Sequence, residues 1–195
     1  VYLGRNVVYP GLPLRRAELL ADFESLSINF HEDWPLVSGA DGRLEVTARE
    51  SRVELREATS FEAKVTNAVV SIPSNGFYID AKLDVVVPVA RALLFAQETS
   101  MELLAPLIGG GLVGEGSLGI DASLRVPLKD RPGEPGDFKL KFEFNNVAVS
   151  LDDPSMRLDS LNGAVEHRSP YQIVKSDLSA NLFGMPIDME ITSGS

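Results

Sequence analysis

The sequence predicts a mostly β protein, built from long antiparallel strands with one helical insert. Three observations lead to this prediction. Apolar and polar residues alternate over long segments, clearest at 77–87 and 138–151, and successive side chains of a strand point to opposite faces. The adjacent Asn145 and Asn146 shift the alternation by one residue, as a β-bulge does when it bends a strand without ending it. Residues 88–108 have a helical character.

The N-terminal half is a series of strands separated by turns. The first strand signal ends at the Asp-Trp-Pro sequence at 33–35, and the second follows a glycine-containing turn at 39–42. A third strand follows a turn signal at 49–51, and the Ser-Asn-Gly sequence at 74–76 is typical of a hairpin turn. We therefore expect strands near Phe23, Leu44, Val53, Phe61 and Phe77.

The helical insert divides this half from a second group of strands. Pro88 suits a first helical turn, the leucines up to residue 108 favour a helix, and Gly109 to Gly111 would end it. A polar, glycine- and proline-rich loop follows at 129–137. We expect strands at 118–126, 138–151, 158–165, 171–182 and 184–191, giving about nine to eleven in the chain.

The chain reads as a single segment, 1–195, cut from a longer protein, because it begins with Val1 rather than Met. It also contains a weak internal sequence repeat. A shift of 121 positions places Leu26 on Val147 and Gly42 on Gly163. This internal similarity predicts two half-repeats, 23–87 and 137–192, on either side of the helical insert at 88–108.

Composition excludes several classes of function. A net charge of −10 argues against nucleic acid as a partner, because binding a polyanion depends on clustered Lys and Arg. The absence of cysteine excludes disulfides and thiolate sites. The longest uncharged apolar stretch, 103–114, is far shorter than the roughly 20 residues that span a bilayer.

No motif of a catalytic or cofactor site is convincing. Residues 109–114 fit the dinucleotide pattern G-x-G-x-x-G, but that motif needs a strand before the glycines and a helix after them, and the expected order is reversed. His31 with Asp33, and the adjacent Asp152 and Asp153, sit where surface turns are expected. Trp34 suits a wedge over a sheet corner. We therefore predict no catalytic residue, no metal site and no cofactor.

Three segments, taken in order, are similar to a known family. Residues 26–46 form a strand, a Pro-containing break and a glycine turn; residues 87–128 carry the helical insert between two strands that end in Val-Pro; residues 146–186 repeat the strand and turn pattern. This order resembles the AsmA-like family of Gram-negative bacteria, most closely the central repeat region of its YhdP-type members. The resemblance covers about residues 23 to 192.

The resemblance implies a role in lipid transport. Such proteins are anchored in the inner membrane and extend through the periplasm as a U-shaped β groove with an apolar lining, which carries phospholipid toward the outer membrane. We expect this chain to be one segment of such a groove, with phospholipid acyl chains and neighbouring repeats of the full-length protein as its partners. The expected lining comprises Leu26, Ile28, Phe30, Phe77, Ile79, Leu83, Val85, Leu118, Ile120, Leu124, Phe138, Leu140, Phe142, Phe144, Val147 and Val149.

Two alternatives remain open from the residues alone. A folded-over sheet with a closed, dry core would show the same alternation, and it would make the chain a structural or adhesive module of a surface or periplasmic protein. An enzyme using His31 with Asp33 or Asp152 is the third reading. The strands by themselves favour the closed sandwich, and the family resemblance favours the open groove.

Overall fold

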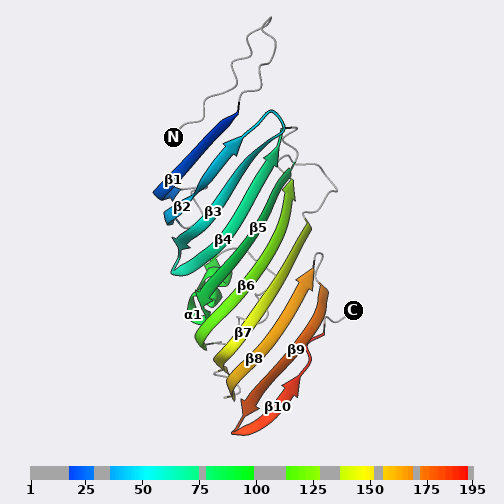
Figure 1. Ribbon diagram of the computed structural model, residues 1–195. Coiled ribbons are helices and arrows are strands. Elements are labelled where there is room, and N and C mark those ends of the chain that lie inside the picture. The colour runs from blue at the N-terminus through cyan, green and yellow to red at the C-terminus, as the bar shows by residue number, and fades with distance from the viewer. Residues whose placement is uncertain are drawn as a thin grey trace, which may run out of the picture.

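The computed structural model describes residues 18–28, 36–74, 78–98, 113–127, 137–151, 156–168 and 172–192. These residues form one ten-stranded antiparallel sheet, in which the strands follow one another in chain order from β1 to β10 (Figure 1). The strands are β1 (Leu19–Ile28), β2 (Val37–Val46), β3 (Glu50–Ser60), β4 (Ala63–Pro73), β5 (Tyr78–Pro88), β6 (Val113–Pro127), β7 (Asp137–Leu151), β8 (Met156–Arg168), β9 (Gln172–Leu182) and β10 (Met185–Met189).

The sheet is open, because β1 and β10 lie at its two opposite edges and do not pair with each other (Figure 1). This confirms the predicted fold class, a long curved antiparallel sheet with a helical insert. A closed sandwich needs two sheets that face each other. The described residues contain a single sheet, and its two edge strands do not pair to close it.

The helix α1 (Val89–Glu98) follows β5 directly and contacts the adjacent strands β5 and β6 (Figure 1). It falls within the predicted helical insert at 88–108, and residues 99–112 lie outside the described residues. Gly114 on β6 makes the close approach of α1 possible. A Cβ atom at this position would lie 2.2 Å from Cγ1 of Val89, so any larger residue would push the helix away from the sheet.

The predicted bulge in β7 is confirmed. Between Phe144 and Val147 the register of β7 against β8 shifts, and Asn146 has a φ of 51°, a left-handed conformation that Asn tolerates better than most residues. The side chain of Asn162 on β8 accepts a hydrogen bond from the Asn146 backbone N–H at 2.9 Å. The bulge is therefore held by a specific side chain of the neighbouring strand.

A second bulge of the same kind lies at the other end of the sheet. Ser25 on β1 has a φ of 52°, and its backbone N–H donates a hydrogen bond of 2.8 Å to Oδ1 of Asp41 on β2. Ser25 and Asp41 lie 121 positions before Asn146 and Asn162. We call β1–β4 the N-terminal unit and β7–β10 the C-terminal unit.

The two units share further irregularities. Gly39 in β2 and Ser160 in β8, again 121 positions apart, have φ values of 59° and 52°. In each unit a phenylalanine faces a glycine across the first strand pair, since Phe23 pairs with Gly42 and Phe144 pairs with Gly163. The half-repeats 23–87 and 137–192 stay a prediction as domain bounds, but these strand geometries are common to both units.

Two boundary predictions are wrong for related reasons. The glycine-containing segment 39–42 is not a turn, because it lies inside β2, where positive φ at Gly39 produces a bulge. The strand expected from Phe61 begins at Ala63 instead. Phe61 and Glu62 have φ values of 51° and 63° and form the tight two-residue turn that joins β3 to β4.

Candidate functional site: an uncovered apolar sheet face

The register gathers apolar side chains on one face of the sheet. Residues directly opposite each other in an antiparallel pair point to the same face. Val85 on β5 faces Ile120 on β6, which in turn faces Phe142 on β7. A parallel row joins Ala81 to Leu124 and then Phe138, while charged residues of these strands point to the other face.

The same face continues across the whole sheet. The row through Phe142 extends to Val165 on β8 in one direction and through Val65 to Ala58 on β3 in the other. Beyond β3 it continues to Ala40 and Phe23, and beyond β8 to the apolar residues of β9 and β10. We call this surface the apolar face, and the opposite surface the polar face.

The apolar face contains the described part of the predicted lining. Phe30 and Phe77 lie outside the described residues, and Ile28 is placed by its backbone pairing with Val37. On the apolar face lie Leu26, Ile79, Leu83, Val85, Leu118, Ile120, Leu124, Phe138, Leu140, Phe142, Phe144, Val147 and Val149.

Sequence reasoning missed the contribution of β3 and β4 to this face. Leu55 and Ala58 both point to it, as do Val65 and Ala68, although each pair is three positions apart. Strict alternation assigns such residues to opposite faces. The usable signal was that alternation resumes in the opposite phase after each irregularity, as it visibly does at Asn145 and Asn146 in β7.

Little covers the apolar face in the part of the chain that the structure describes. Its phenylalanines Phe23, Phe138, Phe142 and Phe144 are all partly exposed. Val147 is the largest of the described side chains that are fully buried. Because a closed core would bury its aromatic side chains, which carry the most apolar area, partial exposure of all four indicates a face open to solvent.

The helix α1 covers one part of the apolar face. The helix α1 places Val89 beside Val87 and Leu118, and Val147 belongs to the same buried cluster. Outside this cluster the apolar face includes exposed residues, since Leu26, Val126 and Met185 expose 38%, 48% and 63% of their surface. An apolar surface that spans several strands exceeds the scattered exposure of a soluble monomer and is typical of a binding site.

The polar face carries cross-strand ion pairs. Arg125 on β6 donates two hydrogen bonds of 2.6 and 3.1 Å to the carboxylate of Asp80 on β5. Arg43 on β2 makes the same arrangement with Asp22 on β1, at 2.8 and 3.2 Å. These hydrogen bonds lower the pKa of both aspartates and raise the pKa of both arginines. All four groups face solvent, so the pairs contribute little to stability.

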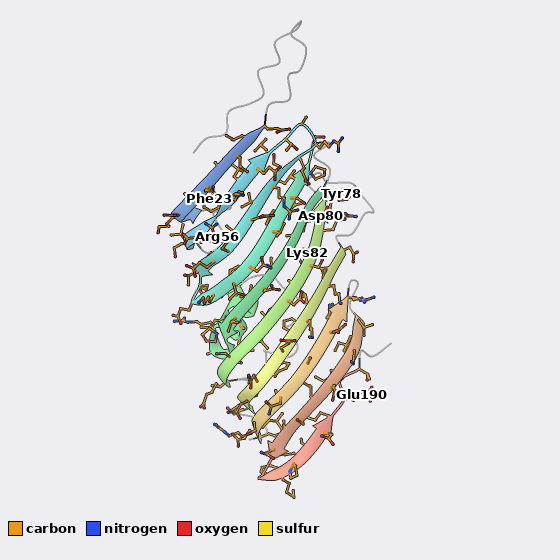
Figure 2. The ribbon with its side chains drawn as sticks, viewed as in Figure 1. Phe23, Arg56, Tyr78, Asp80, Lys82 and Glu190 are labelled. Atoms are coloured by element: carbon orange, nitrogen blue, oxygen red, sulfur yellow. The ribbon has the colours of Figure 1, made fainter. Side chains whose placement is uncertain are left out.

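A shallow hollow of about 460 Å³ also lies on the polar face. Charged side chains of β3, β5, β6 and β7 rim it, among them Asp80 and Lys82, which follow Tyr78 along β5 in Figure 2. A hydrocarbon placed there would strip water from these charges at a high cost. The hollow is therefore no candidate for an apolar ligand.

His167 is the one polar side chain that is buried among the described residues of the apolar face. Its ring stacks on Phe138 at a centroid distance of 5.5 Å, and its Nδ1 atom has no hydrogen-bond partner among the described residues. Burial lowers the pKa of the imidazole, because an apolar environment disfavours its charged form. Burial therefore favours the neutral form of the His167 ring.

The remaining candidates from the sequence lie outside the described residues. They are His31, Asp33, Trp34, Asp152, Asp153 and the glycines at 109–111. Within the described ranges, no group of three or more His, Cys, Asp or Glu side chains could hold a metal ion. Among those same residues, no helix has the length and apolar character needed to cross a membrane.

A comparison with known proteins identifies no similar protein. The chain matches no protein-family profile, no curated protein and no solved structure. The geometry of the sheet and the sequence resemblance are therefore the two features that bear on its function.

Proposed function

We propose that this chain is one segment of a lipid-transfer conduit, in which the apolar face holds phospholipid acyl chains without covalent chemistry. The single observation that carries the proposal is an apolar face continuous across ten strands whose aromatic side chains remain partly exposed. An apolar surface of this extent is unfavourable in water, and a hydrocarbon ligand would cover it. The proposal assigns no catalytic residue.

The energetics of lipid transfer favour such a surface. Exposing a sixteen-carbon tail to water costs on the order of 12 kcal/mol, at about 0.8 kcal/mol per CH₂. This cost is a large barrier to free diffusion of a phospholipid between membranes. A continuous apolar face lowers the barrier, because the tail exchanges one apolar contact for another as it moves along the sheet.

The polar face suits the same role. Its cross-strand ion pairs and the net charge of −10 keep one side of the sheet solvated while the other side holds hydrocarbon. A lipid headgroup needs no pocket of its own, since it can stay in water beyond the open apolar face. The surface would therefore accept lipids with different headgroups.

The resemblance to the AsmA-like family supplies the cellular setting of the proposal. In that setting the chain continues into neighbouring repeats of a full-length protein that is anchored in the inner membrane. The segment lies in the periplasm and carries phospholipid between the inner and outer membranes of a Gram-negative bacterium.

Bound lipid is the direct test of this proposal. Native mass spectrometry and organic extraction of the purified protein should detect phospholipid, and delipidated protein should take up a fluorescent fatty acid. Replacing Phe142 on the apolar face with Gln should weaken that uptake, because a polar amide would then lie beneath the hydrocarbon. The matched control is Val86→Gln on the polar face, where the valine is already 44% exposed.

The two variants separate lipid binding from folding. Circular dichroism should show that both keep the β-sheet spectrum, so that a change in uptake reports the surface alone. Protein free of lipid together with no uptake of the fluorescent fatty acid would contradict the proposal. Equal uptake by the two variants would also contradict it, because binding would then not depend on the apolar face.

A further inference from the structure

His167 places a polar ring in the middle of apolar neighbours. On β8 it faces Leu140 of β7 on one side and Ile173 of β9 on the other, and its ring stacks on Phe138. Only 7% of its surface is exposed. Its Nδ1 atom is buried and forms no hydrogen bond within the described part of the chain. A buried polar atom without a partner lowers the stability of a protein, so folding alone gives no reason for a histidine at this position.

The N-terminal unit shows that an apolar residue fits the equivalent position. Val46 lies 121 positions before His167, and on β2 it faces Leu19 of β1 and Ser51 of β3. Valine continues the apolar face there without any polar atom. The sheet geometry therefore does not require the imidazole, and its hydrogen-bonding capacity is left for a ligand.

His167 lies at one end of an apolar track along β7. It is next to the last residue of β8, and β8 runs in the direction opposite to β5, which leads into α1 (Figure 1). From Leu140, opposite His167, the apolar side of β7 continues through Phe142 and Phe144. It ends at Val147, in the cluster to which α1 contributes Val89.

The length of this track matches one acyl chain. Leu140 and Val147 are seven residues apart, which is about 20 Å along a strand. A hydrocarbon tail in a bilayer extends about 15 Å, half of the roughly 30 Å core that two opposed tails fill. A tail whose polar end lies at His167 therefore ends before the part of the face that α1 covers.

The surroundings of His167 favour a neutral polar group over a charged one. A neutral imidazole has one N–H donor and one acceptor nitrogen, and burial lowers the pKa of this ring. Its neighbours Glu166 and Arg168 point to the polar face, and the residues that it faces on β7 and β9 are apolar. A phosphate or carboxylate would lose its hydration there without gaining a counter-charge, whereas an ester carbonyl needs only a donor.

We infer that a ring N–H of His167 donates a hydrogen bond to the ester carbonyl of an acyl lipid, whose hydrocarbon chain runs along β7 toward α1. Phe138 stacks on the ring and is itself partly exposed, so it can rotate and open the ring to a group on the apolar face. The headgroup then lies past the end of β8. This inference rests on the proposed function and adds to it the chemical class and the orientation of the lipid.

The test compares two ligands with equal numbers of chain atoms that differ in one group. Methyl dodecanoate carries an ester carbonyl, whereas tetradecane is a bare hydrocarbon. Each competes with diphenylhexatriene, a fluorescent hydrocarbon without polar groups, for the 195-residue chain. His167→Val should weaken binding of the ester about three- to tenfold, the effect of one hydrogen bond, and should leave binding of tetradecane unchanged.

Two further variants separate hydrogen bonding from packing. His167→Asn keeps an N–H donor close to the place of Nδ1 and should retain part of the affinity for the ester. Ile173→Ala removes an apolar contact beside His167 and should weaken binding of the ester and of tetradecane by the same factor. The β-sheet circular dichroism of each variant checks that it is folded.

A spectroscopic signal reports the hydrogen bond itself. Methyl dodecanoate labelled with ¹³C at the carbonyl should show a downfield shift of that carbon on binding to the unaltered protein, because a hydrogen bond withdraws electron density from it. The shift should be absent with His167→Val. A purely structural role of His167 would change affinities without changing this signal.

A lysophospholipid and a free fatty acid with the same acyl chain distinguish the two sources of such a carbonyl. The lysophospholipid, used below its micelle concentration, should lose affinity in His167→Val by the same factor as methyl dodecanoate. A loss confined to the free fatty acid would overturn the inference, because the partner of His167 would then be a carboxylate.

Failure of this inference differs from failure of the proposed function. Equal effects of His167→Val on the ester and on tetradecane, or the same carbonyl shift with both proteins, would overturn the inference while hydrocarbon binding remains. An unaltered chain that binds neither diphenylhexatriene nor tetradecane would overturn the proposed function together with the inference.

Discussion

The N-terminal and C-terminal units have the same strand geometry but differ in how far they are covered. Both place a positive-φ residue in the first strand and hold it through an Asp or Asn side chain of the second. Yet Leu26 is 38% exposed, whereas Val147, at the equivalent position 121 residues later, is fully buried. Leu26 lies in an edge strand, and Val147 lies between β6 and β8.

This difference shows that the bulges and the burial of side chains have separate causes. The bulges depend on local sequence, because each is fixed by a few residues of two adjacent strands. Burial depends on neighbours that are distant in the chain. Gly116 on β6, for example, brings its backbone close to Val147, where even a Cβ atom would lie 3.3 Å from the Val147 Cα.

The largest contrast between the units should come from a charge at these equivalent positions. Val147→Asp buries an uncompensated carboxylate and should lower the free energy of unfolding by about 3–5 kcal/mol. Leu26→Asp adds the same charge at a partly exposed site and should cost less than about 1 kcal/mol. Urea denaturation measures both values, and similar losses in the two variants would contradict the difference in coverage.

The side chains that hold the bulges should give a smaller contrast. Asn162 accepts the hydrogen bond from Asn146 and also donates one of 2.6 Å to the backbone oxygen of Ser160. Among the described residues, Asp41 makes the equivalent of the first bond, to Ser25, and no second one. Asn162→Ala should therefore cost about 1–3 kcal/mol and Asp41→Ala about 1 kcal/mol.

Thermal or urea unfolding of the two alanine variants checks this order. Asp41→Asn is the matched control, because an amide oxygen can still accept the Ser25 N–H, and it should remain close to the unaltered protein. A neutral effect of Asn162→Ala would show that the bulge in β7 does not depend on this side chain.

Exchanging the residue types at Gly39 and Ser160, the second pair of equivalent positive-φ positions, should have a still smaller effect on stability. Ser160 adopts a φ of 52°, a conformation that costs a residue with a side chain roughly 1 kcal/mol relative to glycine. Ser160→Gly should thus stabilise the chain by up to about 1 kcal/mol. Gly39→Ser should destabilise it by a similar amount through backbone strain alone, since no atom lies within 4 Å of the added Cβ.

Differential scanning calorimetry measures the change in melting temperature of each variant, and the sign of that change is what matters. Opposite shifts in melting temperature would support the equivalence of the two positions. Shifts in the same direction would mean that the positive φ at Ser160 and that at Gly39 have different origins.

The smallest expected effect is a pH dependence of stability, because it arises from a single imidazole ring of the C-terminal unit, that of His167. His167 occupies the position of Val46 in the N-terminal unit, and burial lowers its pKa. The unfolded chain therefore binds a proton more readily than the folded chain, so stability should fall as the pH drops below about 6.5. Above that pH both states are neutral and the effect vanishes.

His167→Val makes the two units alike and should remove this loss of stability between pH 7 and pH 5.5. Glu166 and Arg168 flank His167 but point to the polar face, so they stay unchanged in the variant. An identical pH dependence in the variant and the unaltered protein would assign the effect to other groups.

Much of the sheet could be predicted from local patterns. Alternation located β5 and β7, and the phase change at Asn145 and Asn146 located a bulge, because both depend on residues adjacent in sequence. The glycine-containing segment at 39–42 was misread because a glycine with positive φ serves a bulge as readily as a turn. The turn at Phe61 lacks the Asn-Gly or Asp-Gly signal that such turns usually show.

The openness of the apolar face could not be predicted from alternation. A strand of a closed sandwich and a strand of an open sheet carry the same pattern, since both have one apolar side. The difference depends on whether a second layer covers that side. Partial exposure of Phe142 therefore had to come from the three-dimensional structure.

The most direct test of the central claim, that the apolar face holds hydrocarbon, is paramagnetic broadening of methyl NMR signals by a spin-labelled fatty acid. Leu83 and Leu124 on the apolar face should broaden strongly. Val69 and Val86, on the polar face of β4 and β5, should stay sharp because the sheet separates them from the ligand. Equal broadening on both faces, or none on either, would contradict the account.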